Sequence, residues 1–252
     1  METPPGQLPT KLAKEPLIAV LFEVRFSAKY PASTLLPGVF YNQFPSPPVF
    51  ERLPIAQLPA NIVELTPELR YAPSISMLMD GYAYQIGDRS ILVSCEMPYK
   101  GWTSFRKAID RAIGILRESK IVDRVERFSL KYVDLLEIES LTEQHQAAKL
   151  KIELFGEVLR NEIFHLRVEK KIKSILHVIQ VAAGASVANA DGTKRAGLIL
   201  ETDSIILVEE SELVKFWDSF DQSLEVLHHE NKTMFINSLN SATLSDLGPV
   251  YV

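Results

Sequence analysis

Alternating apolar and charged positions mark residues 17–26 as the first regular element of the chain. Phe22, Val24 and Phe26 fall on one side of an extended segment, and the residues between them are charged. A strand that buries one face and exposes the other has this two-residue period. Three further short strands are predicted after a proline-rich stretch, separated by Asp-Gly and Gly-Asp turn pairs. They cover residues 74–79, 83–86 and 90–96.

Two later segments, 103–119 and 211–239, carry apolar residues at steps of three and four. Trp102 accompanies the first stripe and Trp217 lies in the second. This spacing is typical of amphipathic helices that bury one face. A strand at 123–138 follows the first helix. The remaining predicted elements are a short helix at 150–159 and strands at 163–169, 174–182, 198–203 and 205–209.

The segment 31–60 is punctuated by prolines, which limits it to short elements such as a helix at 35–44. It is unusually aromatic for a connecting segment, so it either covers the core or forms a binding loop. The sequence favours covering, but its exposed part would then be the first candidate for contact with a partner. The candidate partner-binding residues are Phe40, Tyr41, Phe44 and Phe50.

The order of these elements predicts an α+β fold, with antiparallel sheets that are each covered by a long amphipathic helix. The two halves repeat the same order, which predicts an internal duplication of the unit. The predicted segments are a flexible N-terminal lead (1–16), a first α+β unit (17–138), a linker (139–149) and a second unit (150–252) packed on the first.

Composition narrows the classes of function. The chain has 252 residues, of which 46% are hydrophobic, and a formal net charge of −5. An acidic balance disfavours nucleic-acid binding, which draws its affinity from Lys and Arg. No stretch approaches the roughly 20 apolar residues of a membrane span, and no secretory signal is visible at the start. We therefore expect a cytoplasmic protein without membrane contact.

Catalytic and cofactor motifs are missing from the sequence. Phosphate-binding glycine loops and the serine-hydrolase elbow do not occur, and Cys95 is a single cysteine. His165 and His177 fall in neighbouring predicted strands and could face each other, as a metal or acid–base pair. The pattern favours no cofactor and no metal, and it leaves enzymatic activity open while leaning against it.

Basic residues gather in the run 167–173. A solvated strand or loop face explains such a run, and contact with a small anion is the alternative. Arg25, Arg167 and Lys170 are the candidate ligand-binding residues for that alternative.

Three short segments resemble a sporadically distributed family of uncharacterised prokaryotic proteins of about this length. They are Glu15–Phe26, Arg127–Asp134 and the tail from Leu227 to Leu239. The family often has an Asn where Asp134 stands here, and an acid near Ala19. The resemblance implies an accessory protein that travels with mobile or defence-related genes, and it carries no catalytic residues across.

The leading expectation is a non-catalytic protein-binding or regulatory accessory protein, of the kind found in prokaryotic defence or toxin–antitoxin systems. Its partner would be another protein, and a homo-oligomer is a further expectation. The alternative is a small-molecule or anion-binding domain, enzymatic or not, with a pocket between the two units.

Overall fold

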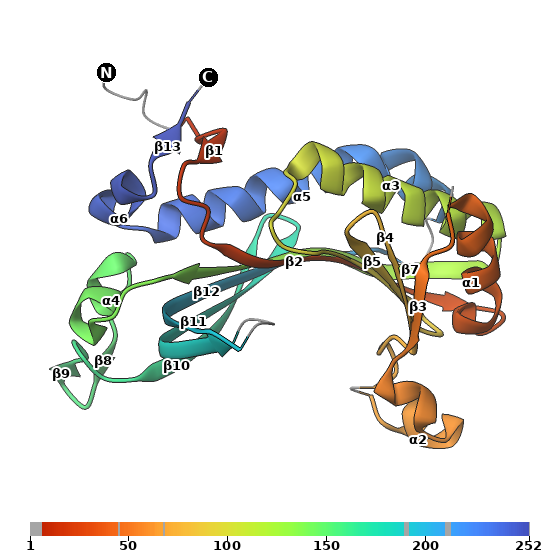
Figure 1. Cartoon of the computed structure of the whole chain (residues 1–252), viewed down its shortest axis with the longest axis horizontal. Helices are drawn as coiled ribbons and strands as arrows, with labels where there is room; N and C mark the ends of the chain where they lie inside the picture. Colours follow the sequence, from red (N-terminus) through yellow and green to blue (C-terminus); the bar gives the residue numbers. More distant parts are fainter. Residues whose placement is uncertain (1–6, 45, 68, 189–191, 210–212, 252) are drawn as a thin grey trace. The chain divides into compact units, whose positions relative to one another are not determined.

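A computed structural model describes residues 7–44, 46–67, 69–188, 192–209 and 213–251 (Figure 1). It confirms an α+β protein with a large antiparallel sheet. The hydrogen-bonded strand order of that sheet is β10-β11-β12-β7-β2-β6-β5-β4-β3. Its strands are β2 (Leu17–Ala28), β3 (Val49–Arg52), β4 (Ile75–Met79), β5 (Tyr82–Ile86), β6 (Ser90–Cys95), β7 (Val122–Leu136), β10 (Phe164–Ile172), β11 (Ile175–Ala188) and β12 (Lys194–Leu207).

Two small antiparallel pairs complete the strands: β1 (Lys11–Leu12) with β13 (Pro249–Val250), and β8 (Glu153–Leu154) with β9 (Glu157–Val158). The helices are α1 (Ala32–Gln43), the 3-10 helix η1 (Pro54–Gln57), α2 (Ala60–Leu65), α3 (Trp102–Ser119), α4 (Leu141–Ala147), α5 (Leu213–Ser238) and α6 (Ser241–Asp246). None of the helices in the described ranges is long and apolar enough to cross a membrane.

The chain divides into two compact units whose segments interleave. Unit 1 contains residues 1–18, 131–204 and 226–252, and unit 2 contains residues 19–130 and 205–225. Strands β2, β7 and β12 and helix α5 therefore contribute residues to both. This grouping differs from the consecutive halves that the sequence predicts, and the internal duplication stays a prediction.

Unit 2 is organised by the alternation along β2. Phe22 and Val24 are paired with Val93 and Ile91 of β6, and all four side chains are buried. The buried face continues into α5, where the ring of Phe220 lies 6.0 Å from that of Phe22. Burial of large aromatic side chains on one face is the main stabilising term of such a sheet.

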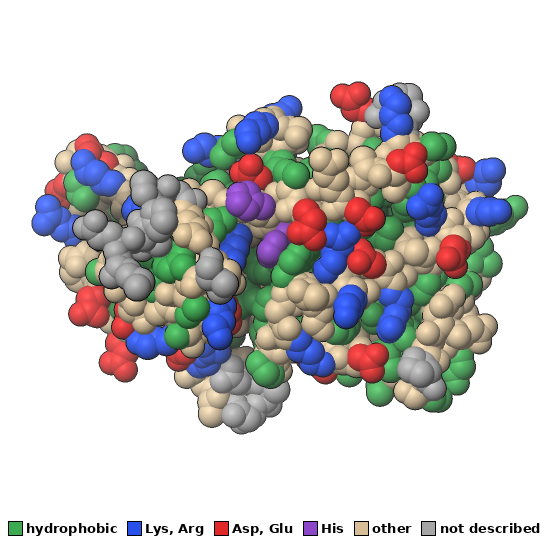
Figure 2. All heavy atoms as spheres, turned by 90° about the horizontal axis from the view of Figure 1, so that it is seen from above, with side chains coloured by type: hydrophobic (Ala, Val, Ile, Leu, Met, Phe, Trp, Pro, Cys, Tyr) green, Lys and Arg blue, Asp and Glu red, His purple; other side chains and the backbone are tan. Residues whose placement is uncertain are grey.

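Arg106 on α3 makes ion pairs with α5 in unit 2. Its guanidinium group lies 2.7 Å from Asp221 and 2.6 Å from Glu225, and it also contacts Asp110 one turn along its own helix. Trp102 donates its indole N–H to Glu225. Figure 2 looks onto this side of the molecule and shows acidic and basic side chains lying next to one another. Trp102 thus links helices α3 and α5 in unit 2.

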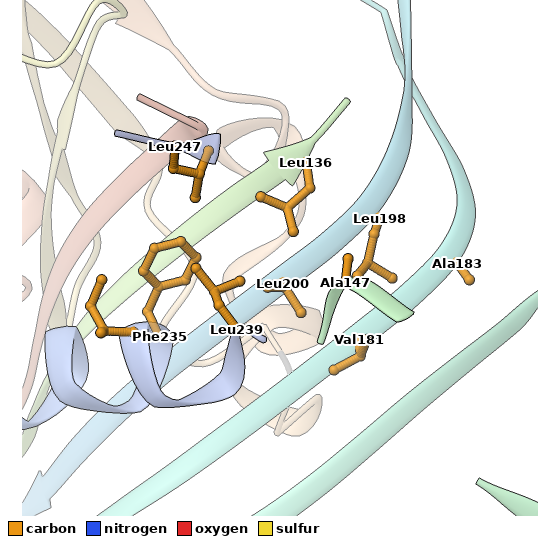
Figure 3. Close-up of a cluster of buried hydrophobic side chains, with 10 residues drawn as sticks. Leu136, Ala147, Val181, Ala183, Leu198, Leu200, Phe235, Leu239 and Leu247 are labelled. Atoms are coloured by element: carbon orange, nitrogen blue, oxygen red, sulfur yellow. The ribbon is translucent and has the colours of Figure 1, made fainter. Parts of the chain in front are cut away.

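Unit 1 has a separate apolar cluster, in which residues of β7, β11 and β12 meet the end of α5 and the C-terminal residues (Figure 3). Its buried members are Leu136, Ala147, Val181, Ala183, Leu198, Leu200, Phe235, Ile236, Leu239 and Leu247. Helix α4 contributes Ala147 to this cluster, although the sequence predicts a linker at 139–149. The Ser140 side chain accepts a hydrogen bond from the backbone N–H of Glu143 and caps this helix.

The two ends of the chain are more regular than the sequence predicts. Residues 1–6 of the predicted flexible lead lie outside the described residues, but Thr10 and Ala13 donate backbone hydrogen bonds to Val250 and Gly248.

The predicted helix at 150–159 is wrong, since residues 153–158 form the β8–β9 hairpin instead. Phe155 and Gly156 both have positive φ, at 53° and 84°, as a tight hairpin turn requires.

Gly197 of β12 provides a stability test, because it lies against the backbone of β7. A Cβ atom there would be 2.0 Å from the carbonyl oxygen of Leu136. We expect Gly197→Ala to lower the free energy of unfolding by about 2–4 kcal/mol in urea titrations, because the strands must separate to admit a methyl group.

The matched control is Gly114→Ala in the interior of α3, where a Cβ would have no neighbour within 4 Å. This substitution should raise the free energy of unfolding by about 0.5–1 kcal/mol, since Ala is the better helix former. An unfolding curve of Gly197→Ala that overlays the parent curve would contradict the close approach of the two strands.

Candidate functional site

The candidate site is a pocket of about 430 Å³ on unit 2. Its walls come from the end of β2 and the start of α1, from η1 to the beginning of β4, and from the turn between β5 and β6. The polar lining residues that the structure describes are Lys29, Tyr30, Ser33, Arg70, Ser74, Asp88 and Arg89. A cavity of this size is within the range of pockets that hold small ligands.

Cationic side chains outnumber carboxylates in this lining. Lys29, Arg70 and Arg89 face a single described carboxylate, Asp88. Asp88 accepts a hydrogen bond from the hydroxyl of Ser33. Lys29 reaches Asp123 only at 3.9 Å, with most of its side chain in solvent. The pocket therefore presents positive charge to an incoming ligand.

An apolar groove adjoins the pocket and shares Ile55, Leu58 and Ala72 with it. It has a volume of about 470 Å³. Its remaining lining residues are Leu53, Pro54, Leu69 and Pro73. The pocket and the groove together, called the basic–apolar surface below, combine anion recognition with a place for hydrophobic side chains.

Tyr71 holds the wall of this surface in position. Its hydroxyl donates to Glu126 at 2.5 Å, and the guanidinium of Arg25 lies 4.6 Å above its ring. Its carbonyl accepts from the hydroxyl of Ser90 at 2.6 Å. Burial and the hydrogen bond to Glu126 both raise the pKa of the Tyr71 phenol. The phenol thus stays protonated and keeps donating at neutral pH.

The ligand-binding residues predicted from sequence lie in different units, Arg25 in unit 2 and Arg167 and Lys170 in unit 1. Arg25 is held by Glu23 at 2.8 Å and by Tyr71, so it supports the wall of the pocket without lining it. In unit 1, Arg167 is paired with Gln180 and Lys170 with His177 across the β10–β11 ladder. Residues at odd and even positions of a strand point to opposite faces. Arg167 and Lys170 therefore cannot bind the same anion together.

Two of the four predicted partner-binding residues are buried, and the other two are exposed. Phe40 and Phe44 pack on Tyr84, with ring centroids 5.6 and 5.3 Å away, and both are buried. They belong to the core of unit 2 and are not available to a partner. Tyr41 and Phe50 are about half exposed and stay candidates for contact.

The two strand histidines do not converge. His165 is paired with Ala182 and His177 with Lys170, which places their side chains on opposite faces of β10 and β11. His177 is fully buried, and its Nδ1 lies 2.9 Å from the hydroxyl oxygen of Ser204. Asn231 donates to the same oxygen at 2.9 Å. No group of three metal-ligating residues occurs within the described ranges.

This His–Ser–Asn cluster does not resemble an accessible catalytic pair. Ser204 and His177 are fully buried, and Asn231 is nearly so. The His177 Nε2 atom has no hydrogen-bond partner among the described residues. Burial lowers the pKa of His177, which keeps the ring neutral. The cluster is best explained as a polar core contact between β11, β12 and α5.

A second buried titratable group in unit 1 is Asp134, which lies on β7. Burial, and secondly the charge of Glu15, raise its pKa well above the usual range. A protonated carboxyl is the expected form of an acid enclosed in this way. Asp134 is 5% exposed, too little for contact with a substrate.

Comparison with known proteins leaves the basic–apolar surface as the main functional evidence. No protein-family model matches the chain, and no curated protein matches it.

Sequence reasoning missed that Lys29, Arg70 and Arg89 line the same pocket. These three residues lie in different segments, and only folding brings them to one pocket.

His228 on α5 generates a pH prediction for unit 1. Burial, followed by the charges of Lys232 and His229, lowers its pKa from 6.5 to about 4. Between these two values the unfolded chain binds the proton more readily than the folded chain. Stability therefore falls as the pH drops from 6.5 toward 4, by about 3 kcal/mol at most for this residue.

We expect His228→Gln to remove this contribution, so that the free energy of unfolding becomes less steep with pH between 4 and 6.5. Urea titrations at closely spaced pH values measure the slope. His165→Gln, at an exposed position of β10 away from His228, is the control and should leave the slope near that of the parent. An unchanged slope in His228→Gln would contradict the lowered pKa of this partly buried histidine.

Proposed function

We propose that this chain is a protein-binding protein that takes an acidic, partly apolar segment of a partner on the basic–apolar surface of unit 2. The observation that carries the proposal is that a pocket lined by cationic side chains adjoins a groove lined by apolar side chains. Lys29, Arg70 and Arg89 supply positive charge, and the adjoining groove is lined by apolar residues. Electrostatic complementarity of this kind favours an acidic ligand.

The apolar groove supports a peptide rather than a free ion. An inorganic anion would use the pocket and leave Leu53, Pro54 and Leu69 of the groove without a partner. A peptide with an acidic residue next to a Leu or Phe would fill both parts. Apolar surface that is exposed beside a polar rim is typical of interaction sites.

The surrounding segment adds further exposed apolar side chains. Among the described residues between positions 30 and 65, nine large hydrophobic side chains are exposed, which is unusual for one short stretch of a folded domain. They are Tyr30, Leu35, Val39, Tyr41, Val49, Phe50, Leu58, Ile62 and Leu65. Both Tyr41 and Phe50 thus stay in the proposed partner region.

A small anionic molecule is the second candidate ligand. The volume of about 430 Å³ and the three cationic side chains favour it. A regulatory role in a prokaryotic defence or toxin–antitoxin system rests on the sequence resemblance alone and stays a prediction.

The proposal is tested by fluorescence anisotropy with short labelled peptides that combine Asp or Glu with Leu or Phe. We expect the Arg70→Glu/Arg89→Glu double variant to bind such a peptide at least tenfold more weakly. Each lost charge-assisted hydrogen bond costs about 1.5–3 kcal/mol. Matched peptides carrying Lys and Arg should not bind, and rising salt should weaken the acidic complex.

The control variant is Lys107→Glu, an exposed position on α3 outside the pocket and the groove. It changes the net charge in the same direction and should bind the acidic peptide as the parent does. If Lys107→Glu weakened peptide binding as much as the double variant does, overall charge and not the pocket would explain the loss of affinity. Binding of citrate or phosphate with no binding of any acidic–apolar peptide would favour the small-molecule candidate.

A further inference from the structure

Strand β10 ends the sheet order on its side, so only one of its two edges is hydrogen-bonded to another strand of the described residues. It is nine residues long and pairs along its whole length with β11. The outer edge therefore offers a row of backbone N–H and C=O groups to any extended segment that approaches it. Edges of this length are templates for strand addition unless something blocks them.

The sequence of β10 is complementary to itself when a second copy runs antiparallel to it. Around Val168, residues at equal distances on the two sides would lie opposite each other. Arg167 would face Glu169 of the second copy, and the same pair would occur again by symmetry. Phe164 would face Ile172 in the same way, and the two Val168 side chains would meet at the axis.

Hydrogen-bond geometry limits the other registers. In an antiparallel pair, a residue that directs its backbone groups outward must face another such residue, so the two-fold axis passes through a residue position. An axis through Arg167 or through Glu169 would place like charges directly opposite each other, which is destabilising. The arrangement centred on Val168 avoids both.

The side chains that this pairing needs are exposed in the single chain. Arg167 and Glu169 lie on one face of β10, 2.7 Å apart and each about half exposed, and Val168 is 42% exposed on the other face. The β8–β9 hairpin and the residues between it and β10 precede β10 along the chain (Figure 1) and add exposed apolar side chains. They are Leu154, Phe155, Val158 and Ile163.

We propose that β10 is a homodimer interface, in which two copies of this chain join edge to edge by antiparallel β10–β10 pairing centred on Val168. The occupant of the edge is a second copy because Arg167 and Glu169 of one copy then lie opposite Glu169 and Arg167 of the other, without like charges facing each other at the axis. Lys170, Lys171 and Lys173 at one end disfavour parallel stacking of copies, in which the lysines would meet. This interface belongs to unit 1 and is independent of the basic–apolar surface.

Light scattering coupled to size-exclusion chromatography tests the proposal on the full chain at about 100 μM, a concentration at which even a weak dimer is populated. The parent protein should be a dimer. Arg167→Glu alone and Glu169→Arg alone each place like charges opposite each other twice, so each should weaken the dimer on the order of tenfold.

An equimolar mixture of the two single variants is the decisive sample. In a heterodimer, Glu at position 167 of one copy faces Arg at position 169 of the other, and Arg167 faces Glu169 in the second contact. The mixture should therefore dimerise about as well as the parent, although each variant alone dimerises more weakly. The intrachain Arg167–Glu169 ion pair cannot explain such a rescue, because it is broken in both variants.

The double variant Arg167→Glu/Glu169→Arg should also dimerise, and Lys107→Glu should behave as the parent does. Circular dichroism confirms that the variants are folded. A monomeric parent protein would overturn the proposal, and so would a dimer that both single variants leave intact. Loss of the dimer without rescue in the mixture would overturn the antiparallel register and with it the proposed interface.

Discussion

Alternation of buried and exposed side chains along antiparallel strands is the constraint on which the candidate site depends. In β2, Phe22 and Val24 must enter the core of unit 2, which sends Glu23 and Arg25 to the other face. Charged side chains on that face form ion pairs with one another, such as the one between Glu23 and Arg127 at 2.5 Å. A register slip of one residue would bury the charges and expose the aromatic rings.

The same face supports the wall of the pocket. Arg25 stacks on Tyr71, Tyr71 donates to Glu126, and the backbone of Tyr71 is held by Ser90. Arg70 and Ala72, the neighbours of Tyr71, line the pocket. Arg25, which the sequence predicts to bind a ligand, thus holds in place the segment around Tyr71 that lines the pocket. The ligand-facing charges are Arg70, Arg89 and Lys29.

Much of the fold, but little of the site, is predictable from the sequence. The strand at residues 17–26 and the helix at 103–119 follow from local periodicity, which needs no tertiary information. Local signals are also present for two elements that the prediction does not include: Ser140 and Glu143 form a helix-start pattern, and Gly156 marks a hairpin turn. The grouping of Lys29, Arg70 and Arg89 has no local signal, because three separate segments supply it. The internal duplication has no structural test and stays a prediction.

Hydrogen–deuterium exchange tests most directly whether the basic–apolar surface is where the partner binds. The protein would be measured alone and with a saturating acidic peptide that contains Leu or Phe. The account predicts slower exchange in residues 29–33, 53–67 and 69–74, which build the pocket and the groove. Protection confined to unit 1, or the absence of protection in a sample where the peptide is bound, would contradict it.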